Sequence, residues 1–433
     1  MTPDVMIILA FVIFLALLGA GMSIPFAITI PGIVYLLMQG GLPAMKGLGL
    51  VSWGSLDSFT LTAIPLFIFM AEIMQGGGLT LRIYRGLAKL VAPIPGGLLQ
   101  TNIAGCALFA SISGSSVATA ASIGSVALPQ LLKRNYHRPM AAGSLAAGGT
   151  LGILFPPSLA MIVYSSFTEV SVAKLFMAGV FPGLILTGMF MAYIAIRCMI
   201  SPGLAPKEAG AGSFGEMALA ALDVVPFMLL IGGILGSIYA GWMTPAEAAA
   251  CGCLLVLLLC AVFGELRLSL LNQALQRAVK TVGNILFIVY AAYVFSYAIS
   301  LSGVGESVTA FLVGLHLSRT GFFVALFLLY TLLGCLVESL GMIVITVPLL
   351  FPVLLQYGFD PVWFGVILVM FIELGQISPP IGINLFVIQS IWDGELGQVV
   401  LGTIPFHIIM FVLLAMLVIW PDIALWLPEH MPK

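Results

Sequence analysis

The sequence predicts an all-α, polytopic membrane protein made of two inverted repeats, with about ten membrane crossings and two re-entrant hairpins. Three observations predict this class. Of the 433 residues, 61% are hydrophobic and only 7% are charged, whereas about a quarter of the residues in ordinary soluble domains are charged. The apolar residues form runs of about 17–25, the length that a helix needs to cross a bilayer. One motif also occurs twice at a wide spacing, which indicates an internal repeat.

The repeat is carried by a Gly-x-x-x-Pro-Pro motif. Gly152-Ile-Leu-Phe-Pro156-Pro157 returns as Gly375-Gln-Ile-Ser-Pro379-Pro380, at an offset of 375 − 152 = 223 residues. The same offset aligns Ser116 with Ser339 and pairs the apolar stretches of the two halves. These stretches are 5–20, 24–40, 60–78, 99–132, 139–167 and 172–197, followed by 222–241, 244–263, 281–301, 320–356, 361–389 and 400–420.

Two of these stretches, 99–132 and 320–356, are too long for one crossing. Polar residues and glycine interrupt them at Ser113–Ser116 and Glu338–Gly341. We expect each to form a re-entrant hairpin, which is tolerated at membrane depth where protein or a polar cavity surrounds its tip. Each repeat then has five crossings, and because five is odd the second repeat enters from the opposite side. The two tips should meet near the middle of the bilayer.

The distribution of Lys and Arg gives an orientation. With the N-terminus outside, eleven of these residues fall in cytoplasmic loops and four fall outside, as the positive-inside rule requires. The base of the first hairpin, next to Lys133-Arg134, is then cytoplasmic. The segment 266–280 is basic and amphipathic, and we expect it to lie along the cytoplasmic interface. The chain has no P-loop that would bind ATP and no basic patch that would bind nucleic acid.

The two Pro-Pro motifs predict broken helices. Proline lacks the N–H donor and pushes the preceding residue out of the α region, so each span should unwind and restart, with proline early in its second piece. The freed carbonyls suit a small cation such as Na⁺; a proline kink repaired by neighbouring helices is the alternative. Expected cation ligands are Ser115, Ser116, Thr119, Gly152, Pro156, Glu338, Ser339, Gly375, Ser378 and Pro379.

The hairpin tips supply groups for an anionic solute. Ser115 or Ser116 can cap the second helix of the first hairpin, whose free N–H groups and positive dipole end would face an anion. Glu338, in the second tip, is costly at membrane depth and therefore indicates a cation ligand or a proton carrier. Close helix packing by Ser and Gly, or structural pairing of Glu338, are the alternatives. Expected substrate ligands are Ser113, Gly114, Ser115, Ser116, Ser158, Ser339, Gly341 and Asn384.

Other polar residues give weaker signals. Glu373 and Glu72 could form ion pairs or titrate, but neither has an acidic counterpart at the repeat offset, where Thr150 and Phe295 stand. Gln376 offers a neutral oxygen near the second break. Ser113 with the distant His407 would suit an intramembrane hydrolase, but that reading explains neither the repeat nor the paired breaks. We therefore expect a protein that is not an enzyme.

Several segments resemble the large membrane subunit of the tripartite ATP-independent periplasmic (TRAP) transporters. Leu151–Ser158 resembles the family's first Gly-x-x-x-Pro-Pro-Ser segment, and Gly375–Phe386 resembles its second Pro-Pro-x-Gly-x-Asn-Leu-Phe segment. Gly114–Thr119 and Ile343–Pro348 agree as well. The sequence departs from the family pattern at Glu338, where Asp is frequent, and at Ser378, where Thr is usual.

This resemblance implies a function and partners. It implies an importer of small organic acid anions in the bacterial inner membrane, coupled to Na⁺ and working by an elevator motion, with a small four-helix membrane subunit and a periplasmic substrate-binding protein. The resemblance also implies membership of the wider ion-transporter superfamily. A self-sufficient cation/anion symporter of that superfamily and a passive channel are the alternatives. The expected parts are a scaffold at 1–85 and 217–310, a moving transport domain at 86–200 and 311–420, a linker at 201–216 and a tail at 421–433.

Overall fold

The computed structural model describes residue 9 and residues 12–14, 16–206, 214–263, 266–302 and 304–432, and within them every regular element is a helix. The α-helices are α2 (Ile24–Ala44), α3 (Leu48–Leu56), α4 (Ala63–Gly76), α5 (Leu79–Leu90), α6 (Leu98–Ser113), α7 (Ser116–Lys133), α8 (Arg138–Leu154), α9 (Leu159–Thr168), α10 (Val172–Ile200), α11 (Phe214–Tyr239), α12 (Pro245–Val262), α13 (Leu268–Ser302), α14 (Val304–Gly314), α15 (Arg319–Gly334), α16 (Ser339–Gln356), α17 (Pro361–Gln376), α18 (Ile383–Ile391), α19 (Leu396–Ile419) and α20 (Asp422–Glu429).

The helix boundaries confirm the predicted repeat. Both ends of α7 map onto the ends of α16 at the same offset, since 339 − 116 and 356 − 133 are both 223. The pair α8 and α9, broken at the first Pro-Pro motif, matches α17 and α18, broken at the second. The two predicted hairpins are α6 with α7 and α15 with α16. The repeat therefore extends from sequence motifs to whole helices.

Eight helices among the described residues are long and apolar enough to cross a membrane, or nine if the bent pair Ile24–Met38 and Gly40–Ser55 is one span. Seven of the eight coincide with predicted crossings, and the eighth is the hairpin arm α16. The predicted crossing 361–389 consists of two shorter helices, α17 and α18. Parts of the first predicted crossing, 5–20, and of the linker 201–216 lie outside the described residues.

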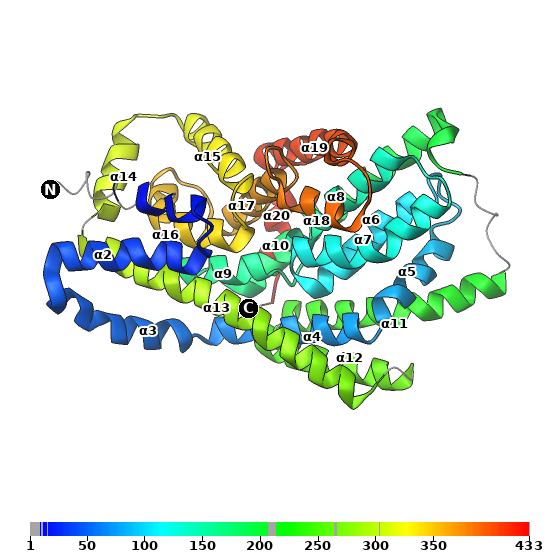
Figure 1. Cartoon of the computed structure of the whole chain (residues 1–433), viewed down its shortest axis with the longest axis horizontal. Coiled ribbons are helices and arrows are strands. Elements are labelled where there is room, and N and C mark those ends of the chain that lie inside the picture. The colour runs from blue at the N-terminus through cyan, green and yellow to red at the C-terminus, as the bar shows by residue number, and fades with distance from the viewer. Residues whose placement is uncertain are drawn as a thin grey trace.

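The helices form two packed groups (Figure 1). Helices α2 to α5 pack with α11, α12 and α13, and Figure 1 shows α3, α4, α12 and the long α13 along the lower edge of the molecule. Helices α6 to α9 pack with α15 to α19, and α15 and α19 lie along the upper edge. The hairpins and both broken helices belong to this second group. Helices from the two repeats are interleaved in each group.

Two expectations about local structure are wrong. The second hairpin turns at Cys335–Glu338, so that Ser339 and Gly341 lie in the first turn of α16 rather than at the tip. This turn places Glu338 at the N-cap of α16, the position that Ser115 holds in α7. The segment 266–280 is not a separate interfacial helix, because α13 runs without a break from Leu268 to Ser302. Its apolar side packs onto the neighbouring helices and continues into the span.

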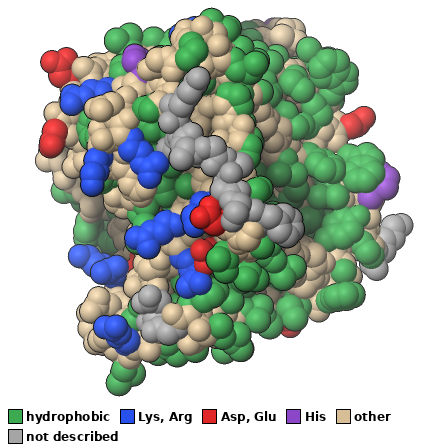
Figure 2. Space-filling view, turned by 90° about the vertical axis from the view of Figure 1, so that its right-hand side faces the viewer, with side chains coloured by type: hydrophobic (Ala, Val, Ile, Leu, Met, Phe, Trp, Pro, Cys, Tyr) green, Lys and Arg blue, Asp and Glu red, His purple; other side chains and the backbone are tan. Residues whose placement is uncertain are grey.

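The surface is consistent with a bilayer environment. Exposed leucines line the outer sides of α11 and α12, among them Leu229 at 69% and Leu254 at 67% exposure. Figure 2 shows the end of the molecule at which α5, α6 and α11 lie. Lys and Arg side chains gather on one side of this face, and hydrophobic side chains cover much of the rest. Basic and lipid-compatible surfaces are therefore separated.

Candidate functional site: two hairpin tips facing one pocket

The first tip is a tight turn closed by glycine and serine. Gly114 has a φ of 60°, a left-handed conformation that favours glycine. Ser115 is extended and caps α7, since its hydroxyl accepts a hydrogen bond from the Ala118 N–H at 3.4 Å. This confirms the predicted cap and assigns it to Ser115. The first N–H groups of α7 are thereby held at the tip.

Oxygen atoms gather behind this tip. Ser113 Oγ lies 2.7 Å from Thr119 Oγ1, which in turn donates to the Ser115 carbonyl at 2.8 Å. Gly152 of α8 closes the cluster, because a Cβ at this position would lie 2.4 Å from the Ser115 carbonyl oxygen and 2.6 Å from Thr119 Oγ1. The first tip and the end of α8 before the first break are therefore in direct contact, as the sequence predicts.

The first break lies against the same tip. Between α8 and α9 the chain is unwound at Phe155–Ser158, with a cis bond between Pro156 and Pro157. Ser158 caps α9 and donates to the Ile153 carbonyl at 2.6 Å. The prolines thus precede the cap instead of starting the second half-helix, which corrects the expectation, because the serine side chain takes the capping position. Leu159 N–H donates to the Gly114 carbonyl at 3.2 Å.

The second tip and break use different contacts. The backbones of Gly334 and Gly375 touch, since a Cβ on Gly375 would lie 2.6 Å from the Gly334 Cα. Cys335 Sγ donates to the Pro379 carbonyl at 3.3 Å. Ser378 donates to the Leu374 carbonyl at 2.6 Å and lies 3.1 Å from His407 Nε2. The Ser378 hydroxyl is therefore occupied within its own half.

The two tips open onto one pocket, as expected. Its volume is about 290 Å³. Ser113, Gly114 and Ser115 line it from the first tip, and Glu338 and Ser339 line it from the second. Glu72 and Gln75 of α4 and Thr281 and Asn284 of α13 form the opposite side. The described lining residues include no Lys or Arg.

The other predicted ligands lie behind the pocket wall. Ser116, Thr119, Ser158 and Asn384 are buried and do not line the pocket. Gly341 faces Ile24 of α2, where a Cβ would meet Ile24 Cδ1 at 3.2 Å. Pro379, in contrast, is exposed at the second break. The structure therefore brings the two tips together on the pocket, and these buried side chains form a second layer behind it. The first break reaches the pocket wall through its flanking residues Ile153, Leu159 and Ala160.

A hydrogen bond links the two repeats in this second layer. Ser116 donates to Gln376 Oε1 at 2.5 Å, and both side chains are buried. Sequence reasoning noted Gln376 only as a neutral oxygen, and no spacing or motif could have paired it with Ser116. Glu373 and Asn384 are fully buried, and in the described part of the chain none of their side-chain oxygen or nitrogen atoms has a hydrogen-bond partner.

The ligand types fit an alkali cation. Hydroxyl and carbonyl oxygens of Ser113, Ser115 and Thr119 form a compact neutral set, the kind of ligand that unwound helices offer to Na⁺. The described residues contain no group of three or more His, Cys, Asp or Glu that would hold a transition metal. The second half offers a carboxylate, Glu338, beside the shared pocket.

Comparisons with known proteins agree with this architecture. Residues 11–423 match the family described as "Tripartite ATP-independent periplasmic transporter, DctM component". The C4-dicarboxylate TRAP transporter large permease protein DctM of Pseudomonas aeruginosa is 33% identical over 389 residues, which cover 89% of this chain and 90% of that protein. The sialic acid TRAP transporter large permease protein SiaM of Vibrio cholerae is 30% identical, with 96% of both chains covered.

A solved structure supports the fold independently. The YdaH transporter of Alcanivorax borkumensis aligns with a TM-score of 0.60 over 92% of this chain and 91% of that chain, at 16% sequence identity. At this identity the likeness concerns the fold alone. The family match covers nearly the whole chain, including both hairpins and both breaks. The chain therefore belongs to the DctM component family of the tripartite ATP-independent periplasmic transporters.

Proposed function

We propose that this chain is the permease of a Na⁺-coupled importer of a small organic acid anion that a periplasmic binding protein delivers. One observation carries the proposal: the N-termini of α7 and α16 converge on a single pocket of about 290 Å³. Free N–H groups and the positive dipole ends of helices attract anions. No Lys or Arg is among the described lining residues, so the helix ends would supply most of the attraction for the anion. This attraction would be weak enough for the anion to be released.

Sodium would hold the tips in shape for the anion. In the first half, the Ser113 and Thr119 hydroxyls and the Ser115 carbonyl are the ligands we assign, next to Gly152. In the second half we assign Glu338 and Ser339, with carbonyls of the Gly375–Pro379 break. A cation between these oxygens and the pocket would also offset the negative charge that Glu72 and Glu338 present to an anion. Substrate binding would thereby depend on Na⁺.

Movement of the hairpins against the scaffold would give alternating access. The pocket lies between the tips and the helices α4 and α13, so a sliding motion would carry one side of it away from the other. Among the described residues, few side-chain hydrogen bonds join the two groups, and one of them is the buried bond from Tyr84 of α5 to Asn102 of α6 at 3.0 Å. Gln75 of α4 donates to Ser122 of α7 at 2.6 Å, and Tyr293 of α13 donates to the Ser166 carbonyl of α9 at 2.9 Å. Such contacts can exchange during an elevator motion.

Location and orientation follow from family membership and charge. We place the chain in the bacterial inner membrane, with the basic side of the face in Figure 2 in the cytoplasm. Its partners would be the small four-helix membrane subunit and the periplasmic binding protein. The two relatives named above have different substrates in their names, a C4-dicarboxylate and sialic acid, at similar identity. The binding protein would therefore select the solute.

The test is uptake by liposomes that contain this chain and its small membrane partner under an inward Na⁺ gradient. We expect saturable uptake only when the binding protein loaded with its solute is present. Replacing the Na⁺ gradient with K⁺ should abolish it. Saturable Na⁺-driven uptake without the binding protein would instead identify a self-sufficient symporter, and flux that neither saturates nor responds to Na⁺ would identify a channel.

A further inference from the structure

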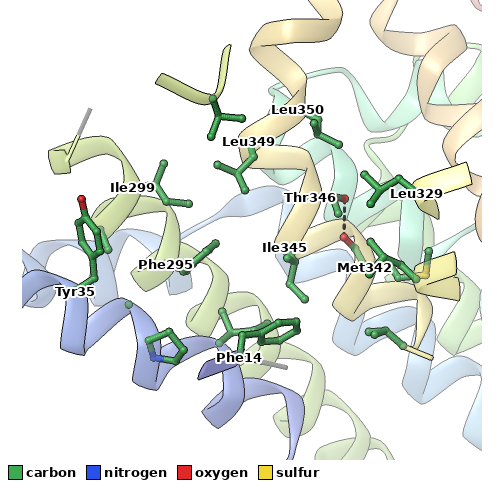
Figure 3. A pocket seen from close by; sticks show the side chains of 17 residues that line it. Phe14, Tyr35, Phe295, Ile299, Leu329, Met342, Ile345, Thr346, Leu349 and Leu350 are labelled. Atoms are coloured by element: carbon green, nitrogen blue, oxygen red, sulfur yellow. Dashed lines mark hydrogen bonds between the residues drawn. The ribbon is translucent and has the colours of Figure 1, made fainter. Parts of the chain in front are cut away.

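A second cavity lies away from the pocket between the tips. It has a volume of about 210 Å³ and is enclosed by α2, α13 and α14 on one side and by the second hairpin, α15 and α16, on the other. Figure 3 shows Tyr35 and Ile299 at one end of this ring of side chains and Met342 and Leu329 at the other. The cavity therefore lies between the second hairpin and the helices α2, α13 and α14.

The lining is apolar. Among the described lining residues, only Tyr35 and Thr346 carry a polar side-chain atom. The Thr346 hydroxyl is already satisfied, because it donates to the Met342 carbonyl at 2.7 Å and lies 2.6 Å from the Tyr330 hydroxyl. An apolar cavity of about 150 Å³ in another protein stays free of water and binds benzene. This larger cavity should therefore bind a hydrocarbon group rather than water.

The cavity wall continues into the outer surface. Leu329, which lines the cavity, is 38% exposed, and the neighbouring Leu328 and Leu332 of α15 are 61% and 65% exposed. In a chain with eight or nine candidate membrane spans, such a surface faces the acyl chains of the bilayer. A hydrocarbon chain can thus enter the cavity from the membrane without crossing a polar barrier.

Tyr35 supplies a second observation, besides the apolar lining, that points to a ligand in the cavity. Its side chain is only 8% exposed and lines the cavity, and its hydroxyl has no hydrogen-bond partner among the described residues. A buried hydroxyl without a partner is costly, so this position requires an acceptor from outside the described chain. An ester carbonyl at the start of an acyl chain is such an acceptor, and tyrosine commonly occurs where an apolar body meets a polar edge in membranes.

We propose that this cavity is a binding site for a glycerophospholipid, with one acyl chain between α2, α13 and α16 and an ester carbonyl that accepts a hydrogen bond from Tyr35. The lipid fills the space between the scaffold and the second hairpin. The site does not depend on the proposed transport function, because it rests on the lining, the opening and the unpartnered phenol.

The experiment uses the full chain with its small membrane partner in phosphatidylglycerol nanodiscs. A trace amount of phosphatidylglycerol carries a diazirine in one of its hydrocarbon chains. In one sample this chain is linked to the glycerol by an ester. In a matched sample it is linked by an ether, which lacks the carbonyl. After irradiation, labelled peptides are mapped by mass spectrometry. With the ester lipid we expect labelling of α2 and α16 to exceed labelling of the exposed face of α12. With the ether lipid the cavity signal should fall about fivefold, the loss expected for one hydrogen bond.

Two variants complete the test. Tyr35→Phe should lower labelling by the ester lipid to the level of the ether lipid and leave α12 unchanged. Ala298→Phe fills the cavity and should abolish its labelling, whereas Ala261→Phe at an exposed position of α12 should not. Equal labelling of cavity and α12 in the wild-type chain, which needs no variant, would overturn the site. Equal cavity labelling by ester and ether lipids, or no effect of Tyr35→Phe, would overturn the ester contact.

Discussion

The two half-sites have the same backbone plan but different chemistry. In the first, Ser113–Ser116 with Gly152–Ser158, neutral hydroxyls bond to one another and to backbone carbonyls. In the second, Glu338–Gly341 with Gly375–Gly382, the N-cap is a carboxylate that makes no capping hydrogen bond. In both halves a glycine allows the tip and the span before the break to approach closely, with Gly152 against the Ser115 carbonyl in the first and Gly375 against Gly334 in the second. Duplication preserved the geometry, while the polar groups diverged.

The two hairpins also meet the scaffold differently. Helix α7 of the first hairpin receives a hydrogen bond from Gln75 of α4. Helix α16 of the second faces α2 across an apolar cavity, and near Gly341 it touches Ile24. A polar contact has a defined geometry and must break when the hairpin moves, whereas an apolar wall can slide. In the proposed elevator motion, the hydrogen bond of the first hairpin would have to break, whereas the apolar contact of the second hairpin could slide.

The largest expected effect comes from locking the first hairpin to the scaffold. In a background without the six native cysteines, Gln75→Cys with Ser122→Cys should react with a short bifunctional thiol reagent. The two cysteines replace a hydrogen-bonded pair of side chains, 2.6 Å apart, that joins α4 to α7. Uptake should be abolished, and cleavage of a reducible linker should restore it.

A matched pair within the scaffold provides the control for this crosslink. Arg82→Cys with Asp223→Cys replaces an ion pair between α5 and α11 whose atoms lie 2.6 Å apart. Because this pair is partly exposed, its loss should lower the stability by at most about 1 kcal/mol. This crosslink should leave uptake intact. If both crosslinks inhibit equally, or if the α4–α7 crosslink does not inhibit, the elevator motion is not supported.

The next effect concerns the contact between tip and break. Gly152→Ala would place a Cβ 2.4 Å from the Ser115 carbonyl oxygen, so it should cost about 1–3 kcal/mol by overpacking and impair uptake. Gly375→Ala should do the same in the second half, where a Cβ meets the Gly334 Cα at 2.6 Å. Thermal unfolding in detergent and liposome uptake would measure both variants.

A glycine in open space is the control for these substitutions. Gly188 of α10 has no atom within 4 Å of an added Cβ, so Gly188→Ala should gain up to about 1 kcal/mol from helix propensity. Should Gly152→Ala behave like Gly188→Ala, the contact between the tip and α8 would not matter for function.

The carboxylate of the second half gives the third prediction. Glu338→Gln keeps the size of the side chain and removes its charge; no capping hydrogen bond is lost. Stability should change little, but the Na⁺ concentration for half-maximal uptake should rise about tenfold, which corresponds to about 1.4 kcal/mol of binding. Ser115→Ala, at the equivalent position, should instead cost about 1 kcal/mol of stability through its lost cap. An unchanged Na⁺ response in Glu338→Gln would remove this residue from the cation site.

The last prediction concerns the hydrogen bond between the two repeats. Ser116→Ala removes the donor to Gln376 Oε1 and leaves the buried amide without this partner, so it should cost about 1–3 kcal/mol. Ser111→Ala is the control, since the Ser111 hydroxyl donates to the Ala107 carbonyl one turn earlier in its own helix, and such local bonds contribute little. Equal unfolding temperatures for the two variants would contradict a stabilising role of the link.

Much of the site's framework could be predicted from the sequence. The hairpin at Ser113–Ser116 and both Pro-Pro breaks follow from residues whose backbone limits are local, such as the missing N–H of proline. The second turn was misplaced by a few residues. At this turn Gly334 lies against Gly375, and Glu338 occupies the N-cap position without a side-chain capping bond. Neither feature is visible in a local pattern of glycine and serine.

By itself the sequence determined the class, the repeat and the two pairs of tips and breaks. These depend on the lengths of apolar runs and on local backbone chemistry, which recur 223 residues apart. Only the tertiary structure decided that Ser116 bonds to Gln376 across 260 residues, that Glu72 and Glu338 share a pocket, and that Tyr35 lines an apolar cavity. Such pairings depend on how distant helix surfaces pack, and a single sequence carries no local signal for that packing.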